Sequence, residues 1–148
     1  MEAESVLLER SACSAMIAVM NQEITPTTLA PPAAKYAHAV LSVQPKRWLH
    51  TSGVVPVRPD GTVPAAMETQ AEVVWANLTA LLEEADMSAT DVVSITTYVV
   101  AEHMDLLGKV MAARDAALGG HRAASTLITV PALARPEWKM EISLIAAR

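Results

Sequence analysis

The fold is decided by two short stretches, Arg122-Ala123-Ala124-Ser125-Thr126 and, after a loop with two prolines, Lys139-Met140-Glu141-Ile142. Each opens a segment dense in β-branched and aliphatic residues, so strands are predicted over residues 124–130 and 138–146. Because side chains alternate along a strand, Glu141 lies on the opposite face from its apolar neighbours. Such a carboxylate is either a solvated surface group, paired with Lys139, or a desolvated group suited to general acid/base chemistry.

The rest of the chain alternates between strand and helix patterns. Periodicity predicts strands over residues 37–43 and 47–51, a helix over 67–85, a strand over 92–100, a helix over 105–118, and the two final strands. The first two strands are expected to form a hairpin around Gln44-Pro45-Lys46, and Gly119-Gly120 is expected to end the second helix. The order β-β-α-β-α-β-β predicts an α+β domain, with two helices covering one face of a mixed sheet.

The composition describes one acidic domain whose core is aliphatic. The chain has 148 residues, 52% of them hydrophobic, with no phenylalanine and a net charge of −5. No Lys/Arg cluster is present, which argues against a nucleic-acid partner. The only cysteine, Cys13, excludes an intramolecular disulfide and a cysteine-based zinc site. The four histidines lack metal-ligand spacing, so no metal and no other cofactor is predicted.

Residues 1–22 are predicted to be an N-terminal extension, and residues 23–148 the domain itself. Apolar residues recur at roughly helical spacing in the extension, which is either a short helix or a mobile leader. Its early acidic residues, Glu2 and Glu4, are the opposite of the basic start of a signal peptide. The apolar run 15–20 is far shorter than the ~20 residues of a membrane helix. These features predict a cytoplasmic protein with no membrane partner.

Several further motifs lie between and before these strands. They are Pro32 with Tyr36, Thr51-Ser52-Gly53 with Pro56, Gln70 with Asn77-Leu78, and Asp91-Val92-Val93. Together with Glu141-Ile142, in this order and spacing, they resemble the Rid family, the YjgF-type reactive intermediate deaminases. The resemblance covers about residues 24–148. It implies a Rid/chorismate-mutase-like domain that assembles as a homotrimer, with small-molecule sites in clefts between adjacent subunits.

The resemblance also implies roles for individual residues. Glu141 matches the family glutamate that positions the hydrolytic water, and Tyr36 matches a tyrosine that reaches a neighbouring subunit's cleft. The Ser52-Gly53 turn is placed to touch the ligand, and Ser125 and Thr126 are placed to offer amide or hydroxyl donors. From the residues alone, turn chemistry accounts equally well for Ser52 and Gly53, and an interface position for Tyr36.

The family arginine that grips a substrate carboxylate is replaced by Ala124 in this comparison of motifs. An arginine fork supplies charge and orientation, and alanine supplies neither. Arg122 lies two residues earlier, ~7 Å along a strand, and is either a partial substitute or a surface arginine. Around residues 110–117 the family pattern holds an Asn, a Tyr and paired Phe residues, whereas this chain has valine and alanines. The cleft is therefore expected to be wider or differently shaped.

These features predict a Rid-like protein that binds a small reactive organic molecule between subunits. It is expected to act on an imine or enamine by glutamate-assisted water activation or proton transfer, with 2-iminoacid deamination weak or lost. The alternative is a non-catalytic trimer that binds a small molecule or a protein. A ribonuclease activity fits poorly, because phosphate contacts need clustered cations.

Overall fold

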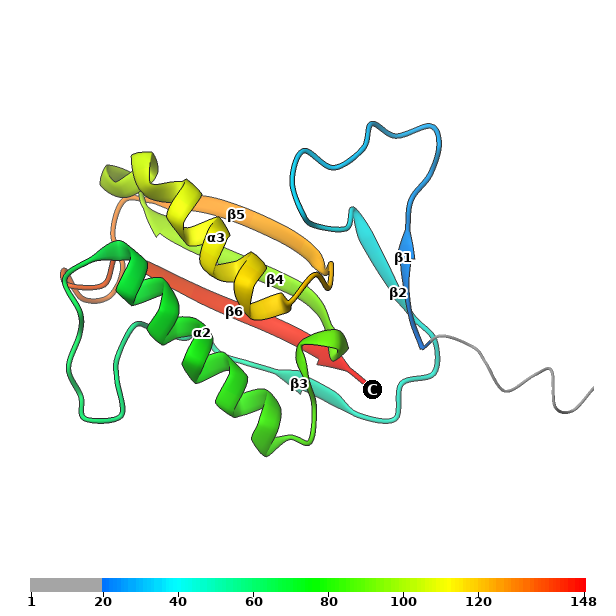
Figure 1. Cartoon of the computed structure of the whole chain (residues 1–148), viewed down its shortest axis with the longest axis horizontal. Helices are drawn as coiled ribbons and strands as arrows, with labels where there is room; N and C mark the ends of the chain where they lie inside the picture. The colour runs from blue at the N-terminus through cyan, green and yellow to red at the C-terminus, as the bar shows by residue number, and fades with distance from the viewer. Residues whose placement is uncertain (1–19) are drawn as a thin grey trace, which may run out of the picture.

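Two helices cover one face of a mixed β-sheet in the computed structural model, which describes residues 20–148. The helices are α2 (Met67–Glu84) and α3 (Leu107–Leu118), and they lie side by side on the sheet (Figure 1). This arrangement confirms the predicted α+β fold. Cys13 and the prediction of a helix or leader near the N-terminus lie outside the described residues.

The sheet has four strands in the order β3-β6-β4-β5. They are β3 (Trp48–His50), β4 (Val92–Val100), β5 (Ala124–Val130) and β6 (Met140–Ala147). β4 and β5 are parallel, whereas β6 is antiparallel to both of its neighbours. A parallel pair needs a long crossover, which here consists of the 3-10 helix η2 (Ala101–Leu106) and α3.

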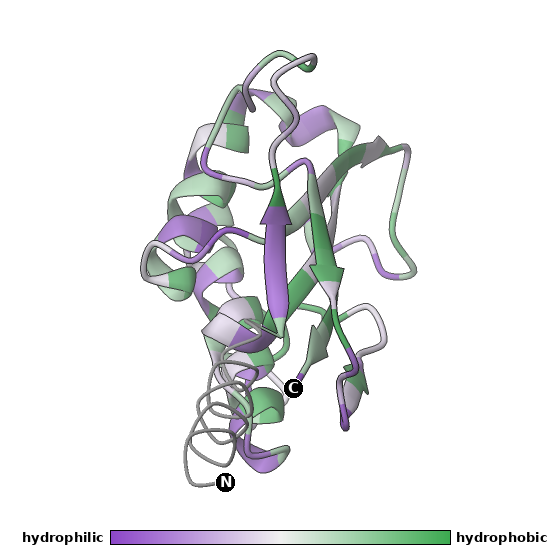
Figure 2. Cartoon of the chain, turned by 90° about the vertical axis from the view of Figure 1, so that its right-hand side faces the viewer, coloured by the Kyte–Doolittle hydropathy of each residue, from purple (hydrophilic) through white to green (hydrophobic). Residues whose placement is uncertain are grey.

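The predicted hairpin between the first two strands is wrong. β2 (Ala39–Ser42) pairs instead with β1 (Asn21–Ile24) in a separate two-stranded sheet, while β3 pairs with β6. The reason lies after Pro45, where the backbone N–H groups of Lys46 and Arg47 both donate to the Arg148 carbonyl at 2.8 Å. These bonds direct the chain to the end of β6 and not back along β2. β1 was not predicted from the sequence, because it is polar for most of its length and lacks the apolar pattern of a strand (Figure 2).

Alternation along the strands separates a helix-covered face of the sheet from an open face. Met140, Ile142 and Leu144 of β6 are buried beneath the helices, whereas Glu141 and Ser143 between them are half-buried on the open face. α2 contributes Val74 and Leu78, among others, to the same core. The predicted strand over residues 92–100 and the predicted helix over 67–85 are confirmed, the helix one residue shorter.

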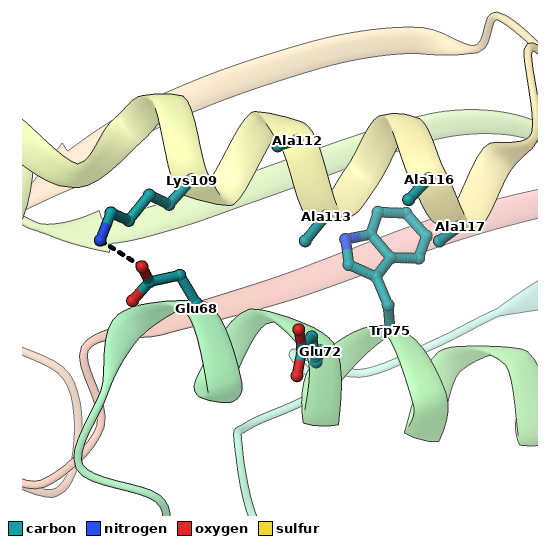
Figure 3. A pocket seen from close by; sticks show the side chains of 8 residues that line it. All are labelled: Glu68, Glu72, Trp75, Lys109, Ala112, Ala113, Ala116 and Ala117. Atoms are coloured by element: carbon teal, nitrogen blue, oxygen red, sulfur yellow. Dashed lines mark hydrogen bonds and ion pairs between the residues drawn. The ribbon is translucent and has the colours of Figure 1, made fainter.

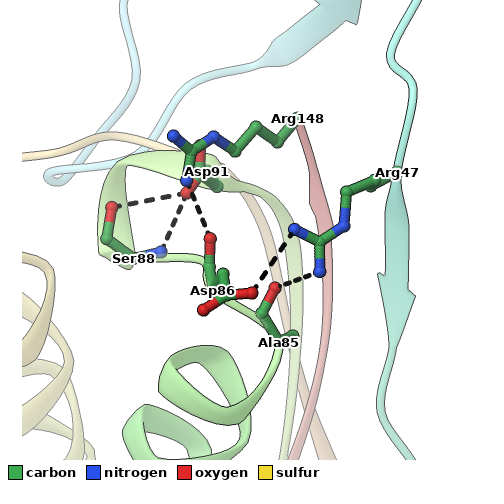
Figure 4. A network of polar contacts seen from close by, with 6 residues as sticks. All are labelled: Arg47, Ala85, Asp86, Ser88, Asp91 and Arg148. Atoms are coloured by element: carbon green, nitrogen blue, oxygen red, sulfur yellow. Dashed lines mark hydrogen bonds and ion pairs between the residues drawn. The ribbon is translucent and has the colours of Figure 1, made fainter.

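The ends of the helices are fixed by turn chemistry and by two arginines. Gly119 adopts the left-handed conformation (φ 57°) and ends α3 as predicted. At the end of α2, Arg47 donates to the Ala85 carbonyl and Arg148 to the Asp86 carbonyl, at 2.5 and 2.7 Å (Figure 4). Cations are stabilised at the negative end of a helix dipole, which is the C-terminal end of α2. Because Arg47 precedes β3 and Arg148 follows β6, the two contacts also join the end of α2 to the sheet.

Candidate functional site

Glu141 is half-buried on the open face of the sheet, near the beginning of β6. None of the ion pairs formed within residues 20–148 includes its carboxylate. Lys139, the partner expected of a surface glutamate, donates from Nζ to the Ala65 carbonyl at 2.6 Å instead. The carboxylate is therefore not neutralised by the lysine beside it in the sequence.

The turn Thr51-Ser52-Gly53 forms a bulge against β6. On one side of it the Thr51 N–H donates to the Leu144 carbonyl at 3.0 Å, and on the other the Val54 N–H donates to the Ile142 carbonyl at 2.7 Å. Two residues of the turn thus stand opposite one residue of β6, as in a β-bulge. The Thr51 hydroxyl also accepts the Leu144 N–H at 2.9 Å, which holds the turn in place.

Gly53 places its backbone directly against the Glu141 side chain. A Cβ at position 53 would overlap the Glu141 carboxylate. This close approach, and not an unusual backbone angle, means that only glycine leaves the Glu141 carboxylate in its present position. The structure therefore brings together two of the predicted site residues, Glu141 and Gly53, with the exposed Ser52 beside them.

Gln70 fixes the position at which β6 begins. Its side chain is fully buried, and its amide nitrogen donates to the carbonyls of Pro64 and Glu137, both at 2.8 Å. Its amide oxygen accepts the Lys139 N–H at 2.9 Å. Because buried polar groups are costly to leave unpaired, these three bonds hold the loop before α2 against the segment that leads into Glu141.

Tyr98 lies beside Glu141 on the neighbouring strand. The register of β4 and β6 pairs Tyr98 with Glu141 and Thr96 with Ser143. Residues paired in this way face the same side, with Cβ atoms ~5 Å apart. Tyr98 is not among the predicted site residues, although alternation within residues 92–100 places it among the residues that face away from the core. Its phenol carries both a hydrogen-bond donor and an acceptor.

A second group of predicted site residues gathers at the beginning of β5. Ala124 and Thr126 lie on the open face, in register with Ser94 and Thr96 of β4. The Ala37 N–H donates to the Ala123 carbonyl at 2.9 Å, which brings Tyr36 to the same end of the strand. Tyr36 packs edge-to-face on His38, with ring centroids 5.8 Å apart.

The sequence and fold of this chain match those of known proteins. The family described as Endoribonuclease L-PSP matches residues 27–148. The chain belongs to the Rid (endoribonuclease L-PSP) family. A Yersinia pestis protein of the conserved Rid family, YyfB, is 32% identical, with a TM-score of 0.80 over 88% of this chain and 100% of that one.

Two further solved structures share the fold. A putative endoribonuclease from Thermotoga maritima is 30% identical over 86% of this chain and 98% of its own, with a TM-score of 0.64. E. coli TdcF, solved with bound serine, is 24% identical over 86% of this chain and 99% of its own, also with a TM-score of 0.64. No curated protein sequence matches this chain significantly.

Two predicted site residues of this Rid protein are engaged elsewhere. Ser125 is in register with Ile95, whose side chain is buried beneath the helices. Alternation therefore turns the Ser125 side chain away from the open face that holds Ala124. Arg122 precedes β5 and forms an ion pair with Glu23 of β1. That contact ties β1 to the beginning of β5.

Within one chain, Glu141 and Ala124 do not share a site. Glu141 of β6 is in register with Tyr98 of β4, and Ala124 of β5 is in register with Ser94 of β4. Glu141 and Ala124 are therefore two strands apart across the sheet and, as Tyr98 is from Ser94, four residues apart along it. At ~4.8 Å per strand and ~3.3 Å per residue, this separation is roughly 16 Å. The predicted residues thus form a glutamate group around Glu141 and an alanine group around Ala124.

The described part of the chain shows neither a metal cluster nor a membrane-spanning helix. In residues 20–148 no three His, Cys, Asp or Glu side chains gather as metal ligands would. Neither helix combines the length and apolarity needed to cross a bilayer.

The alanines of α3 lie on the helix side of the sheet, where Ala113, Ala116 and Ala117 line a cavity facing α2.

Proposed function

We propose that this Rid protein binds a small reactive organic molecule in a cleft between subunits and hydrolyses an imine or enamine with the help of Glu141. The observation that carries the proposal is the Glu141 carboxylate itself. It is half-buried, it belongs to none of the ion pairs within residues 20–148, and it is held against the Gly53 backbone. These properties leave the carboxylate fixed in position and free to exchange a proton with a bound water.

The chemistry requires one proton shuttle and no cofactor. Glu141 takes a proton from water as the water oxygen bonds to the imine carbon, and passes this proton to the imine nitrogen, which gives a carbinolamine. Glu141 then takes the proton of the carbinolamine hydroxyl and returns it to the nitrogen as the C–N bond breaks, so that a carbonyl compound and ammonia leave. Tyr98 is in register with Glu141, and we expect its phenol to donate a hydrogen bond to the oxygen or nitrogen of this intermediate.

A homotrimer is part of the proposal, because the alanine group of one subunit has to meet the glutamate group of another. Apolar side chains on the outside of the described chain support association. Trp48 and Ile128, on the open face, are 52% and 41% exposed, and Leu41 of β2 is 49% exposed. Light scattering is expected to give the mass of three chains. A monomer at micromolar concentration would contradict the inter-subunit cleft.

The specificity proposed for the cleft follows from Ala124, which offers a substrate carboxylate neither charge nor hydrogen bonds. We expect native protein to turn over carboxylate-free imines better than 2-iminopropionate. Ala124→Arg is expected to raise kcat/KM for 2-iminopropionate about ten- to a hundredfold, as charge-assisted bonds of ~1.5–3 kcal/mol would.

The control for this gain is Ala124→Gln, which adds a long side chain without charge and should leave 2-iminopropionate turnover low. Both imines can be generated in situ and followed by release of the carbonyl product. Efficient hydrolysis of 2-iminopropionate by native protein, at or above the rate for the carboxylate-free imine, would overturn the proposed specificity.

The alternative is a non-catalytic trimer that binds a small molecule or a protein. The ion pair between Arg122 and Glu23 favours this alternative, because the Arg122 guanidinium is then not available to bind a substrate carboxylate near Ala124. Under this alternative, ligand binding persists without turnover. Ribonuclease activity is disfavoured by the net charge of −5, since binding to phosphates is driven by clustered cations.

A further inference from the structure

A cavity of ≈ 480 Å³ lies between α2 and α3, on the helix side of the sheet (Figure 3). Glu141 lies on the opposite side of the domain, because its neighbours Met140 and Ile142 point towards the helices and Glu141 points to the open face. The volume falls within the ~300–1,000 Å³ of small-molecule pockets. We call it the interhelical cavity.

Small residues on α3 create the interhelical cavity. Ala112, Ala113, Ala116 and Ala117 form its α3 wall. Ala113 and Ala117 point towards α2, and Ala112 and Ala116, next to them on the helix surface, lie at the exposed edge of the wall (Figure 3). Methyl groups leave space where longer side chains would interlock with α2. The wall is apolar and partly open to solvent, because Ala112 and Ala116 are exposed.

Trp75 of α2 forms the inner part of the cavity and carries an unmet hydrogen-bond donor. The side chain is 5% exposed and projects towards Ala113, Ala116 and Ala117 (Figure 3). Its Nε1 is shielded from solvent and has no hydrogen-bond partner in the described chain. Buried donors are normally satisfied, so an unpaired indole N–H just behind the cavity wall points to an acceptor that reaches it when a side chain of the wall moves aside.

Acidic side chains give the α2 wall a net negative charge. Glu68 forms an ion pair with Lys109 across the cavity, and the hydrogen bond from Lys109 lowers the pKa of the Glu68 carboxyl below its ordinary value. Glu72, one turn further along α2, belongs to none of the ion pairs within residues 20–148. Two carboxylates and one ammonium leave one negative charge, and it lies between the ion pair and Trp75 (Figure 3).

We propose that the interhelical cavity binds an organic ammonium with an apolar body. The ammonium is held by Glu72, and the apolar body lies on the alanines of α3. An acceptor atom of the ligand, or a water that it traps, receives the Trp75 indole N–H. Anionic ligands are disfavoured by Glu72, which is exposed at the edge of the cavity, and a purely apolar ligand would leave the indole N–H without a partner.

The test uses the three indole N–H resonances of the full-length protein, one for each tryptophan. Trp75→Phe assigns its own resonance by removing it. Phenethylamine is the probe, and phenethyl alcohol and 3-phenylpropionate are its neutral and anionic counterparts with the same apolar body. Phenethylamine is expected to shift the Trp75 resonance saturably, and to leave those of Trp48 and Trp138 in place. The two counterparts should bind at least tenfold more weakly.

Two variants separate the charge from the space in this site. Glu72→Gln should raise the Kd of phenethylamine about tenfold, and Ala116→Leu, which fills the cavity from an exposed position, should abolish the shift. Their matched controls are Glu84→Gln and Ala80→Leu, which lie on exposed positions of α2 away from the cavity. Both controls should keep native affinity.

Three outcomes would overturn the proposal. The first is a Trp75 resonance that does not respond to millimolar phenethylamine. The second is an equal response to phenethyl alcohol, with Glu72→Gln unchanged, since the site would then be apolar only. The third is a shift that survives Ala116→Leu in a protein whose remaining spectrum is native, since the ligand would then lie elsewhere.

Discussion

Glu141→Gln is expected to lower kcat for a carboxylate-free imine by about 10²–10⁴-fold, the usual contribution of a positioned general acid/base. The amide cannot take a proton from water or return one to the substrate nitrogen. It keeps the length and shape of the carboxyl group, and so also keeps the packing against Gly53. The fold and the KM should therefore change little. Release of the carbonyl product from an imine generated in situ measures the effect.

The matched control is Glu84→Gln, which makes the same change at an exposed position of α2 and should retain the native rate. Circular dichroism and light scattering establish that both variants keep the fold and assembly of the native protein. If Glu141→Gln turned over the imine at the native rate, Glu141 would not be the general base. If no native turnover were found with any imine, the non-catalytic alternative would be favoured.

The periodicity of apolar residues was sufficient to predict the helices and strands that bury one face in the core. The strand over residues 92–100 and the helix over 67–85 carry dense apolar patterns, and both form as predicted. The pairing of short strands was not predictable in this way. β2 and β3 have four and three residues, too few for a pattern to specify a partner. Hydrogen bonds to Arg148, about a hundred residues away in sequence, decide where β3 lies.

The candidate site was predictable only in its local features. Alternation alone placed Glu141 on the face away from the core, and the structure agrees. The contact of Glu141 with Gly53 depends on the register between β6 and a bulge far away in sequence. The same register brings Tyr98 beside Glu141. The family resemblance implied a cleft between subunits that includes Ala124 and Glu141, and within one chain the sheet order separates these residues by a whole strand.

Gly53→Ala is expected to lower imine turnover by about 10–100-fold while leaving the domain folded. The new methyl group would occupy the space of the Glu141 carboxylate. Since that carboxylate is the end of a flexible side chain, it rotates away, and the free energy of unfolding should fall by no more than ~1 kcal/mol. The cost falls on catalysis, because a misplacement of ~1 Å at a reacting group can cost ~10²-fold in rate. Single-turnover rates together with urea unfolding measure both effects.

Gly108→Ala is the control for this substitution. Gly108 lies in α3, and a Cβ there meets no atom within 4 Å. The exchange should stabilise the domain by ~0.5–1 kcal/mol through helix propensity and leave turnover unchanged. In a Glu141→Gln background, Gly53→Ala should reduce turnover no further, because the two changes disable the same group. Equal losses in the native and Glu141→Gln backgrounds would show that Gly53 acts independently of the carboxylate. The bulge would then serve the ligand directly, and not through Glu141.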